Sequence, residues 1–461
     1  MLNNELLPHQ REAVEKLRKW KIGALFMEQG TGKTITTLEL YRLRAEAGKV
    51  EKCLWLCPCN AKSNIKAEII KQVPDSMLSD FIICGIETLS SSVRANAYLL
   101  RLVKEKKCFL CVDESLLIKN PSAKRTDNII RLAKLCEYKV ILNGTPISRN
   151  EADLFAQFYM LDWRILGYKS YWSFAANHLE YDERIPGKVV RCLNTEYLSQ
   201  KIAPYTYQIT KEECLTLPEK NHDYYCYSLT QEQMEIYRYV EDKLLMQVDE
   251  MKPETIYRLF AGLQAVISGM DVYAETSHLK TWKFFKNPLD NPRIELLMEV
   301  LTEEKTIIFA KYTHEIDDIV KVINEEYGDG TAVRFDGTIS PKKRKQSLDN
   351  FKAEARYFVA NRGCAGYSLN LQFCHNIIYY SNDWDLATRL QSEDRVHRYG
   401  QEHEVRITDL FANHTLDERI YRCVGRKEDL LESFKEEIKK KNSLLNWLNC
   451  KEEIMDVEGG K

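Results

Sequence analysis

The stretch ALFMEQGTGKTITTLEL, residues 24–40, decides the fold class of this chain. An apolar run ending at Met27 leads into a glycine-rich turn, and a helix-like segment follows the turn. Glycines let successive backbone N–H groups point at phosphate oxygens, and a lysine at the helix start can reach the β and γ phosphates. These parts are Gly30, Gly32, Lys33 and Thr34, the last with a hydroxyl for Mg²⁺. The strict pattern GxxxxGK[ST] is not matched, because Met27 stands where it has glycine. The prediction of a phosphate-binding loop therefore rests on the succession of strand, glycine-rich turn and helix.

The composition indicates an ordinary soluble globular protein, with 44% hydrophobic and 29% charged residues among 461. This length allows roughly two to four domains. Fourteen cysteines lie mostly within apolar runs, which favours buried free thiols in a reducing compartment over a zinc site. With no signal peptide and no apolar run of about 18 residues, we expect a cytoplasmic protein, or a nuclear one if the source is eukaryotic.

Short apolar runs alternate with helix-length segments in two stretches, a pattern typical of parallel sheets with crossover helices. In the first stretch the expected strands are 23–27, 52–58, 80–85, 108–114 and 139–145. In the second stretch they are 305–310, 331–337, 356–362, 376–381 and 405–411. The block between them is aromatic-rich, has long helical signals and shows no regular strand spacing. The fold class is therefore α/β, with two doubly wound parallel-sheet lobes and helical insertions between them.

An acidic pair ends the expected strand at 108–114. Carboxylates at the carboxyl end of a parallel strand lie where ligands bind in such sheets. A phosphoryl-transfer site needs one acid for the metal and one group to orient water, and Asp113 and Glu114 suit these two roles. Taken alone, such a pair can equally be a helix start. The turn in ILNGTPISRN, residues 141–150, could sense the γ-phosphate or be merely a turn.

Two further motifs carry a family resemblance. VDESLLIKN, residues 112–120, resembles the DExxxIKN box of the SWI/SNF-type (sucrose non-fermenting) DNA-dependent ATPases of helicase superfamily two, and QSEDRVHRYGQ, residues 391–401, resembles their arginine motif. Other pieces similar to family motifs occur in the family's order at 6–14, 56–69, 307–312, 334–351 and 366–385. The resemblance implies two RecA-like lobes that use ATP and Mg²⁺ and act on double-stranded DNA.

The resemblance also implies roles for individual residues. Arg395 and Arg398, three apart and on one face if their segment is helical, would neutralise the γ-phosphate from the second lobe, while Thr34 and Asp113 would hold the metal ion. Nucleotide binding would fall to Gln10, Gly30, Thr31, Gly32, Lys33, Thr34 and Gly366. The expected DNA-backbone contacts are Lys62, Thr88, Lys119, Asn120, Lys311, Gly337, Thr338, Arg362 and Trp384. For each contact residue taken singly, a solvated surface or a packing role is the alternative.

The sequence departs from the family at two places. Leu116 stands where the family often has histidine, which puts coupling between the γ-phosphate and lobe closure in question. Gln208, Ile209, Thr210 and Lys211 stand where the family tends to have an Arg-Arg-Thr-Lys run.

The expected domains are a first ATP-binding lobe (1–165), a helical insertion region (166–290), a second lobe (291–425) and a charged helical tail (426–461). A net charge of −2 shows no bulk basic field, so any DNA contact depends on local clusters such as SPKKRK, residues 340–345, which can also be solvated helix faces. We expect an ATP-driven monomeric translocase on duplex DNA whose target is chosen by the insertions, the tail or a protein partner. The alternatives are a strand-separating or annealing helicase and an ATP-gated DNA-binding switch.

Overall fold

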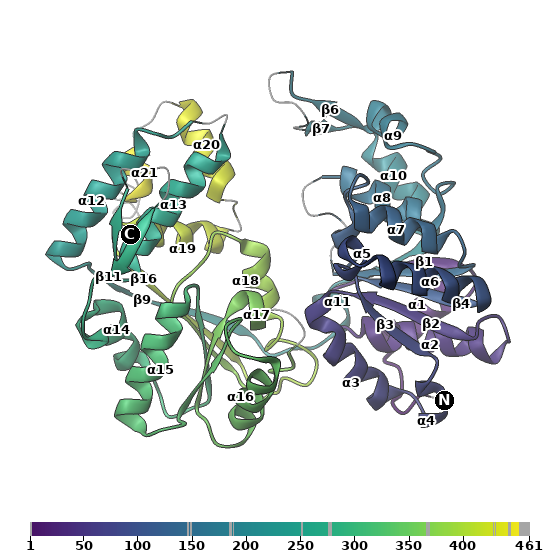
Figure 1. Cartoon of the computed structure of the whole chain (residues 1–461), viewed down its shortest axis with the longest axis horizontal. Helices are drawn as coiled ribbons and strands as arrows, with labels where there is room; N and C mark the ends of the chain where they lie inside the picture. Colours follow the sequence, from purple (N-terminus) through teal and green to yellow (C-terminus); the bar gives the residue numbers. More distant parts are fainter. Residues whose placement is uncertain are drawn as a thin grey trace, which may run out of the picture. The chain divides into compact units, whose positions relative to one another are not determined.

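The computed structural model divides the chain into two compact units, Met1–Thr216 and Leu217–Lys461 (Figure 1). The residues that the structure describes are 2–144, 147, 150–183, 187, 189–249, 252–274, 279–365, 369–426, 428, 430–440 and 444–450.

Unit 1 is built on a six-stranded, all-parallel sheet in the order β3-β2-β4-β5-β1-β8. Its strands are β1 (Ile22–Met27), β2 (Lys52–Cys57), β3 (Phe81–Gly85), β4 (Cys108–Asp113), β5 (Tyr138–Asn143) and β8 (Thr206–Ile209). The five strands expected from the sequence are confirmed. The sixth, β8, pairs with the outer side of β1, beside the strand that leads into the glycine-rich loop.

Both faces of this sheet are buried, which explains why its strands are continuous apolar runs. Side chains alternate between the faces of a strand. Leu25 and Met27 therefore face one hydrophobic cluster, with α1 (Pro8–Leu17), α2 (Lys33–Glu46) and α3 (Lys62–Gln72), while Ala24 and Phe26 face another. The second cluster includes residues of α6 (Val93–Glu105), α7 (Lys124–Ala133) and α8 (Ala152–Asp162). Shorter helices are α4 (Asp75–Leu78), α5 (Thr88–Ser91) and α11 (Lys211–Cys214).

An aromatic extension continues from α8 and includes α9 (Tyr171–His178), β6 (Leu179–Tyr181), β7 (Val189–Cys192) and α10 (Thr195–Ile202). Phe174 is fully buried there against Phe155, with ring centroids 5.3 Å apart. The His178 ring is held at both nitrogens, 3.0 Å from the Leu193 carbonyl and 2.9 Å from the Tyr168 hydroxyl. The phenylalanine packing fastens the extension to α8, and the His178 contacts hold the extension itself together.

Unit 2 has a second six-stranded, all-parallel sheet, in the order β13-β14-β12-β15-β16-β9. Its strands are β9 (Lys220–Tyr227), β12 (Thr306–Ala310), β13 (Ala332–Phe335), β14 (Tyr357–Asn361), β15 (Asn376–Tyr379) and β16 (Val405–Ala412). Ile307 and Phe309 face one cluster, and Ile308 and Ala310 face the other. Helices around the sheet are α14 (Pro292–Val300), α15 (Thr313–Tyr327), α16 (Pro341–Ala353), α17 (Arg362–Ala365), α18 (Leu386–Glu393) and α19 (Leu416–Arg426).

A separate helical core in unit 2 joins the middle of the chain to its C-terminal part (Figure 1). It contains side chains of α12 (Gln231–Leu245), α13 (Pro253–Ile267), α19, α20 (Leu430–Lys440) and α21 (Leu444–Leu448). The strands β10 (Met270–Tyr273) and β11 (Lys280–Lys283) form an antiparallel hairpin beside α13.

The predicted fold class, with two doubly wound parallel sheets, is confirmed. The interpretation of the middle of the chain missed β8 and β9, because Thr206–Ile209 and the mostly exposed Lys220–Tyr227 lack the apolar runs of the other strands. The bounds of the four expected domains stay a prediction. Within the described residues, no helix is both long and apolar enough to cross a membrane.

Candidate nucleotide site and arginine segment

The glycine-rich loop of unit 1 has the backbone geometry that a phosphate cradle needs. Gly30 and Gly32 have φ angles of 88° and 96°, in the left-handed region that favours glycine. Gly32 is the N-cap of α2, which begins at Lys33. The free N–H groups of that helix start carry partial positive charge. The predicted strand, turn and helix therefore form as expected.

Gln10 on α1 reaches this loop directly. Its Nε2 donates to the Thr31 carbonyl at 2.9 Å, and its Oε1 accepts from the Leu7 N–H at 3.0 Å. A Cβ on Gly32 would clash with Gln10 Nε2. The glutamine thus fixes the loop backbone, and its predicted role in nucleotide binding stays a prediction.

Lys33 lies across the loop toward the end of β1. Its Nζ donates to the Met27 carbonyl at 2.8 Å. Thr31 is buried, with its hydroxyl donating to the Glu28 carbonyl at 2.7 Å, and Thr34 lies partly buried in the first turn of α2. The loop therefore holds the lysine ammonium beside the backbone that would cradle phosphates.

Asp113 is the last residue of β4 and Glu114 follows it, at the same carboxyl edge of the sheet as Met27. Burial, and then the neighbouring Glu114 carboxylate, raise the pKa of Asp113 to about 7, while Lys33 acts in the opposite direction. The lysine and the carboxylate are thus close enough to interact electrostatically. Burial destabilises the charged form of this carboxylate, and a hard cation such as Mg²⁺ would stabilise it.

Glu114 has an unusual backbone, with φ 52° and ψ 55°. A non-glycine residue in this left-handed region is strained, and such strain concentrates at functional sites. The 3₁₀ helix η2 (Ser115–Ile118) follows at once and contains Leu116. Ser115 in η2 donates to Gln157 Oε1 at 2.6 Å, which ties the acidic turn to α8.

One contact of the glycine-rich loop, which joins Glu28 to Lys211, was not predicted from the sequence. The backbone N–H of Lys211 donates to Glu28 Oε2 at 2.8 Å, and Lys211 Nζ lies 3.7 Å from Glu28 Oε1. The Glu28 N–H donates to the Ile209 carbonyl at 3.0 Å. The run at 208–211, which departs from the family pattern, therefore braces the residue after Met27. Only knowledge that β8 pairs with β1 could have revealed this.

The predicted DNA contacts of unit 1 follow the carboxyl ends of three neighbouring strands. Lys62 begins α3 after β2, Thr88 begins α5 after β3, and Lys119 and Asn120 follow η2 after β4. Lys62 and Asn120 are exposed, whereas Lys119 Nζ lies 3.7 Å from Asp153 Oδ1. Thr88 Oγ1 is 3.5 Å from Cys59 Sγ. They share the sheet edge of the phosphate loop, and their role stays a prediction.

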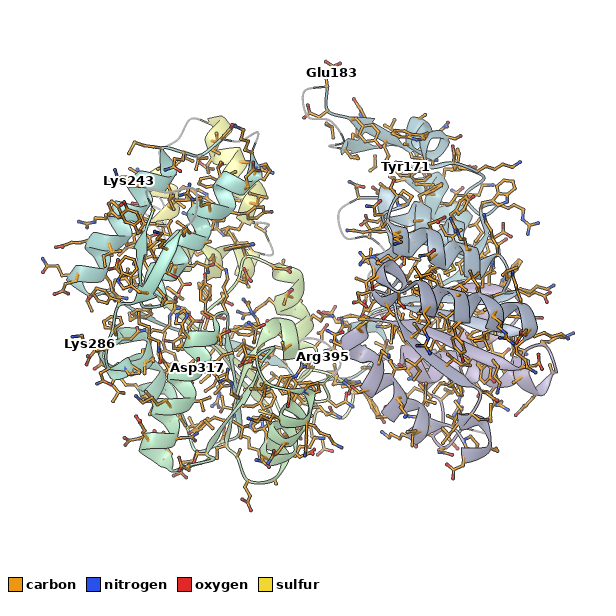
Figure 2. The ribbon with its side chains drawn as sticks, viewed as in Figure 1. Tyr171, Glu183, Lys243, Lys286, Asp317 and Arg395 are labelled. Atoms are coloured by element: carbon orange, nitrogen blue, oxygen red, sulfur yellow. The ribbon has the colours of Figure 1, made fainter. Side chains whose placement is uncertain are left out.

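In unit 2 the two predicted arginines follow α18, which ends at Glu393. Figure 2 labels the first of them, Arg395. The two arginines would lie on one face only if their segment were helical, and it is not, because residues 394–400 form turns. The Arg395 carbonyl accepts from the Leu371 N–H at 3.1 Å, and Arg398 Nη1 donates to Asn370 Oδ1 at 2.5 Å. Their contact with phosphate stays a prediction. Gly366 and the Thr145–Pro146 part of the turn in the first lobe lie outside the described residues.

The predicted DNA contacts of unit 2 are mostly engaged with other side chains. Lys311 Nζ lies 3.6 Å from the centre of the Trp384 ring and 3.2 Å from Asp383 Oδ1. Burial lowers the pKa of Lys311, and Asp383 opposes this. Arg362 is only 3% exposed, with Nη2 3.9 Å from Asp383 Oδ2. A DNA phosphate would have to compete with Asp383 for both cations.

The turn after β13 carries the other two predicted contacts of unit 2. Gly337 lies there, next to Thr338. The Thr338 N–H donates to Asp336 Oδ1 at 2.6 Å, and its hydroxyl donates to the same oxygen at 2.5 Å. The aspartate therefore holds this turn in place.

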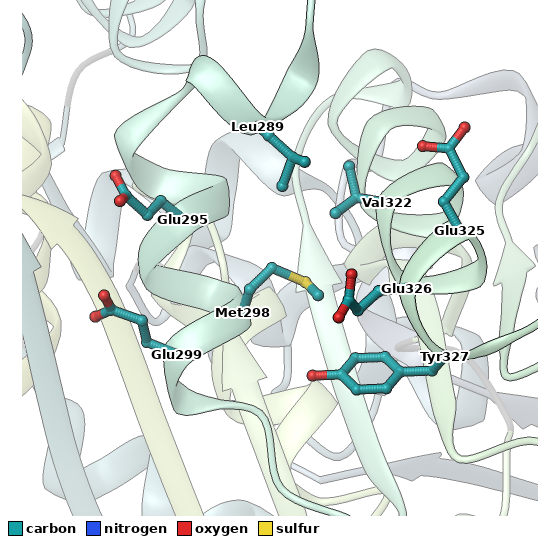
Figure 3. A pocket seen from close by; sticks show the side chains of 8 residues that line it. All are labelled: Leu289, Glu295, Met298, Glu299, Val322, Glu325, Glu326 and Tyr327. Carbon is teal, nitrogen blue, oxygen red and sulfur yellow. The ribbon is translucent and has the colours of Figure 1, made fainter.

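A pocket of about 520 Å³ lies elsewhere in unit 2, between α14 and α15 (Figure 3). Met298 and Val322 face each other across it, and four glutamates stand around them. The lining residues are Leu289, Glu295, Met298, Glu299, Val322, Glu325, Glu326 and Tyr327. None of the predicted site residues lines this pocket.

Two family models match the chain. The SNF2-related domain matches residues 81–268, and the helicase conserved C-terminal domain matches residues 292–400. Similar curated proteins include the TATA-binding protein-associated factor mot1 of Aspergillus fumigatus, 24% identical over 92% of this chain and 26% of that protein. The DNA repair and recombination protein RAD54B of Gallus gallus is 23% identical over 93% of this chain and 54% of its own length.

A putative ATP-dependent helicase/translocase YwqA of Bacillus subtilis is 24% identical over 70% of this chain and 35% of its own length. The chain thus spans about a quarter to a half of these relatives. Among solved structures, the Sulfolobus solfataricus SWI2/SNF2 ATPase core in complex with dsDNA is 21% identical, with 97% of each chain covered and a TM-score of 0.42. With an SNF2-related domain followed by a helicase conserved C-terminal domain, the chain belongs to the SNF2-related ATPases.

Proposed function

We propose that this chain is an ATP-dependent translocase on double-stranded DNA, which hydrolyses ATP to move along the duplex or to remodel protein–DNA complexes. The observation that carries the proposal is that Lys33, Asp113 and two positive-φ glycines lie at one edge of the sheet. A cradle, a cation and an acid in one place are what phosphoryl transfer requires. The matched SNF2-related family favours duplex DNA as the track.

In this proposal each residue of unit 1 has a separate task. The loop N–H groups from Gly30 to Lys33 bind the phosphates, and Lys33 exchanges its contact with the Met27 carbonyl for a phosphate oxygen. Thr34 and Asp113 would hold Mg²⁺, which when bound neutralises charge on the phosphates. Glu114 orients the attacking water, and its strained backbone keeps the carboxylate at the edge of the sheet.

The arginines of unit 2 are proposed to complete the reaction. Guanidinium groups stabilise the negative charge of the transferred phosphoryl group, and such an arginine is worth about 10³ to 10⁵ in rate. Arg395 and Arg398 would therefore make hydrolysis depend on their approach to the nucleotide. If each unit binds the DNA backbone in turn, that dependence converts hydrolysis into movement.

The test compares phosphate release with no nucleic acid, single-stranded DNA, duplex DNA and RNA. We expect duplex DNA to stimulate turnover most, and Lys33→Ala and Glu114→Gln to abolish it. Lys49→Ala, an exposed lysine beyond the end of α2, is the matched control and should keep wild-type turnover. Full stimulated turnover in Lys33→Ala would refute the assigned site.

Leu116 favours a second candidate, an ATP-gated DNA-binding switch in which nucleotide changes DNA affinity without sustained turnover. Steady phosphate release with duplex DNA excludes it. Triplex displacement on an intact duplex then reports movement, and a forked substrate reports strand separation or annealing. Unwinding of the fork without triplex displacement would replace the translocase by a helicase.

A further inference from the structure

The chain enters unit 2 through a segment that is bound to the arginine segment. We call residues 218–220 the connecting segment and residues 394–401 the arginine segment. Unit 1 ends at Thr216, so the connecting segment follows it after a single residue. Its attachment to the core of unit 2 therefore comes directly after the chain leaves unit 1.

Three successive residues of the connecting segment are held. His397 Nε2 lies 2.8 Å from the Pro218 carbonyl, and because a carbonyl only accepts, this ring nitrogen carries the hydrogen. The Glu219 carbonyl accepts from the Val405 N–H at 3.0 Å. Lys220 Nζ donates to Glu393 Oε2 at 3.0 Å. Two of the three partners, Glu393 and His397, flank or belong to the arginine segment.

The Glu393 end of this connection is rigid. Arg389 Nε donates to Glu393 Oε1 at 3.0 Å, and the same guanidinium makes two hydrogen bonds to Asp409, at 2.5 and 2.9 Å. The guanidinium also lies 3.5 Å from the centre of the Tyr379 ring. Burial acts to raise the pKa of Glu393, but Lys220 and Arg389 together bring it below its ordinary value. Glu393 is therefore a buried carboxylate shared between the core and the connecting segment.

The His397 end carries the arginines themselves. Val396 is fully buried, the His397 N–H donates to the Glu393 carbonyl at 2.9 Å, and Gln401 Nε2 donates to the Cys374 carbonyl at 2.9 Å. The backbone on both sides of His397 is thus fastened to the core. Arg395 lies two residues before His397 and Arg398 one residue after it. A shift of the His397 ring must be taken up by the turn that bears both arginines.

We propose that the connecting segment positions the arginines, with His397 as the positioning residue through its hydrogen bond to the Pro218 carbonyl. The inference rests on the proposed function, since it assigns these arginines to hydrolysis. Because the chain runs from Thr216 almost directly into Pro218, any change in the path of the connecting segment acts on His397. The connection between the units thereby influences the alignment of Arg395 and Arg398, in addition to tethering the units.

The test uses three variants of the full chain. His397→Ala removes the donor, His397→Gln keeps an N–H donor of similar reach, and His403→Ala removes an exposed histidine of the same region as the matched control. Misplacement of a catalytic group by about 1 Å can cost a hundredfold in rate. We expect kcat with saturating duplex DNA to fall about ten- to a hundredfold in His397→Ala, with KM for ATP nearly unchanged. His397→Gln should recover most of the loss, and His403→Ala should match wild type.

A second readout does not depend on hydrolysis. Hydrogen–deuterium exchange should rise in His397→Ala at residues 217–221 and 394–401 together, and stay at the wild-type level in β12. Unchanged exchange in either segment overturns the inference, as does an unchanged kcat in His397→Ala or a loss that His397→Gln does not rescue. If wild type itself shows no stimulated hydrolysis, the proposed function fails, and the exchange experiment alone decides whether the two segments are coupled.

Discussion

Replacing Arg293 with methionine should loosen unit 2 while leaving unit 1 unaffected. The Arg293 guanidinium, 1% exposed, contacts Asp417 Oδ2 and lies 3.8 Å from Glu315 Oε1, and both carboxylates are almost fully buried. Removing the cation leaves two buried carboxylates without their counter-charge, at a cost of about 3–5 kcal/mol. That is a large part of the roughly 5–15 kcal/mol that stabilises a typical domain. The opening equilibrium of unit 2 should therefore increase about 10²- to 10⁴-fold.

Native-state hydrogen exchange measures this loss unit by unit, which whole-chain unfolding of a two-unit protein cannot do. The amides of β12 report unit 2 and those of β4 report unit 1. The control is the triple variant Arg293→Met, Glu315→Gln, Asp417→Asn, which removes the unpaired charges and should regain at least half of the lost stability. Wild-type exchange of β12 in Arg293→Met, or a triple variant no better than the single one, would refute the reasoning.

Three further outcomes follow from the site. Gly32→Ala should lower the affinity for a fluorescent ATP analogue at least about tenfold, because the added Cβ would clash with Gln10 Nε2. Gly48→Ala is the control, because Gly48 also has a positive φ but has open space around it, so this variant shows the effect of backbone strain without a clash. Without Mg²⁺, Asp113→Asn should be more stable than wild type by about 1–2 kcal/mol at pH 8 in thermal unfolding. The folded pKa of about 7 lies above the unfolded value, so wild type loses stability as pH rises from about 4 to 7, and the difference between the two should vanish near pH 4. If the DNA contacts are to phosphates, duplex affinity should fall with salt by a log–log slope of about −0.9 per contact, and a salt-independent affinity would exclude backbone binding.

The strands that could be predicted from the sequence are those that are buried on both faces of a sheet. Strands such as Lys52–Cys57 are buried on both faces and must be apolar almost throughout, so their runs are visible without a structure. The edge strand β9 has no such requirement, since six of its eight residues are exposed, and its pairing with β16 depends on backbone hydrogen bonds that any sequence can make. The short edge strand β8 likewise lacks an apolar run, and with it the Glu28–Lys211 contact stayed hidden. Local motifs therefore revealed the phosphate loop, whereas the contacts that brace it depend on which strands become neighbours.

The predicted DNA contacts differ between the units for a related reason. In unit 1 the motif residues Lys62 and Asn120 end on the surface, where a phosphate can reach them directly. In unit 2 Lys311 and Arg362 share Asp383, and the indole of Trp384 covers Lys311. A motif gives only the residue types and their spacing, and these are the same whether a cationic side chain is exposed to solvent or paired with an acidic side chain. The motif alone therefore cannot distinguish an exposed cation from a paired one. If Asp383 competes with DNA for these cations, Asp383→Asn should tighten duplex binding, and a weaker binding would instead identify Asp383 as the group that holds them in place for the phosphate.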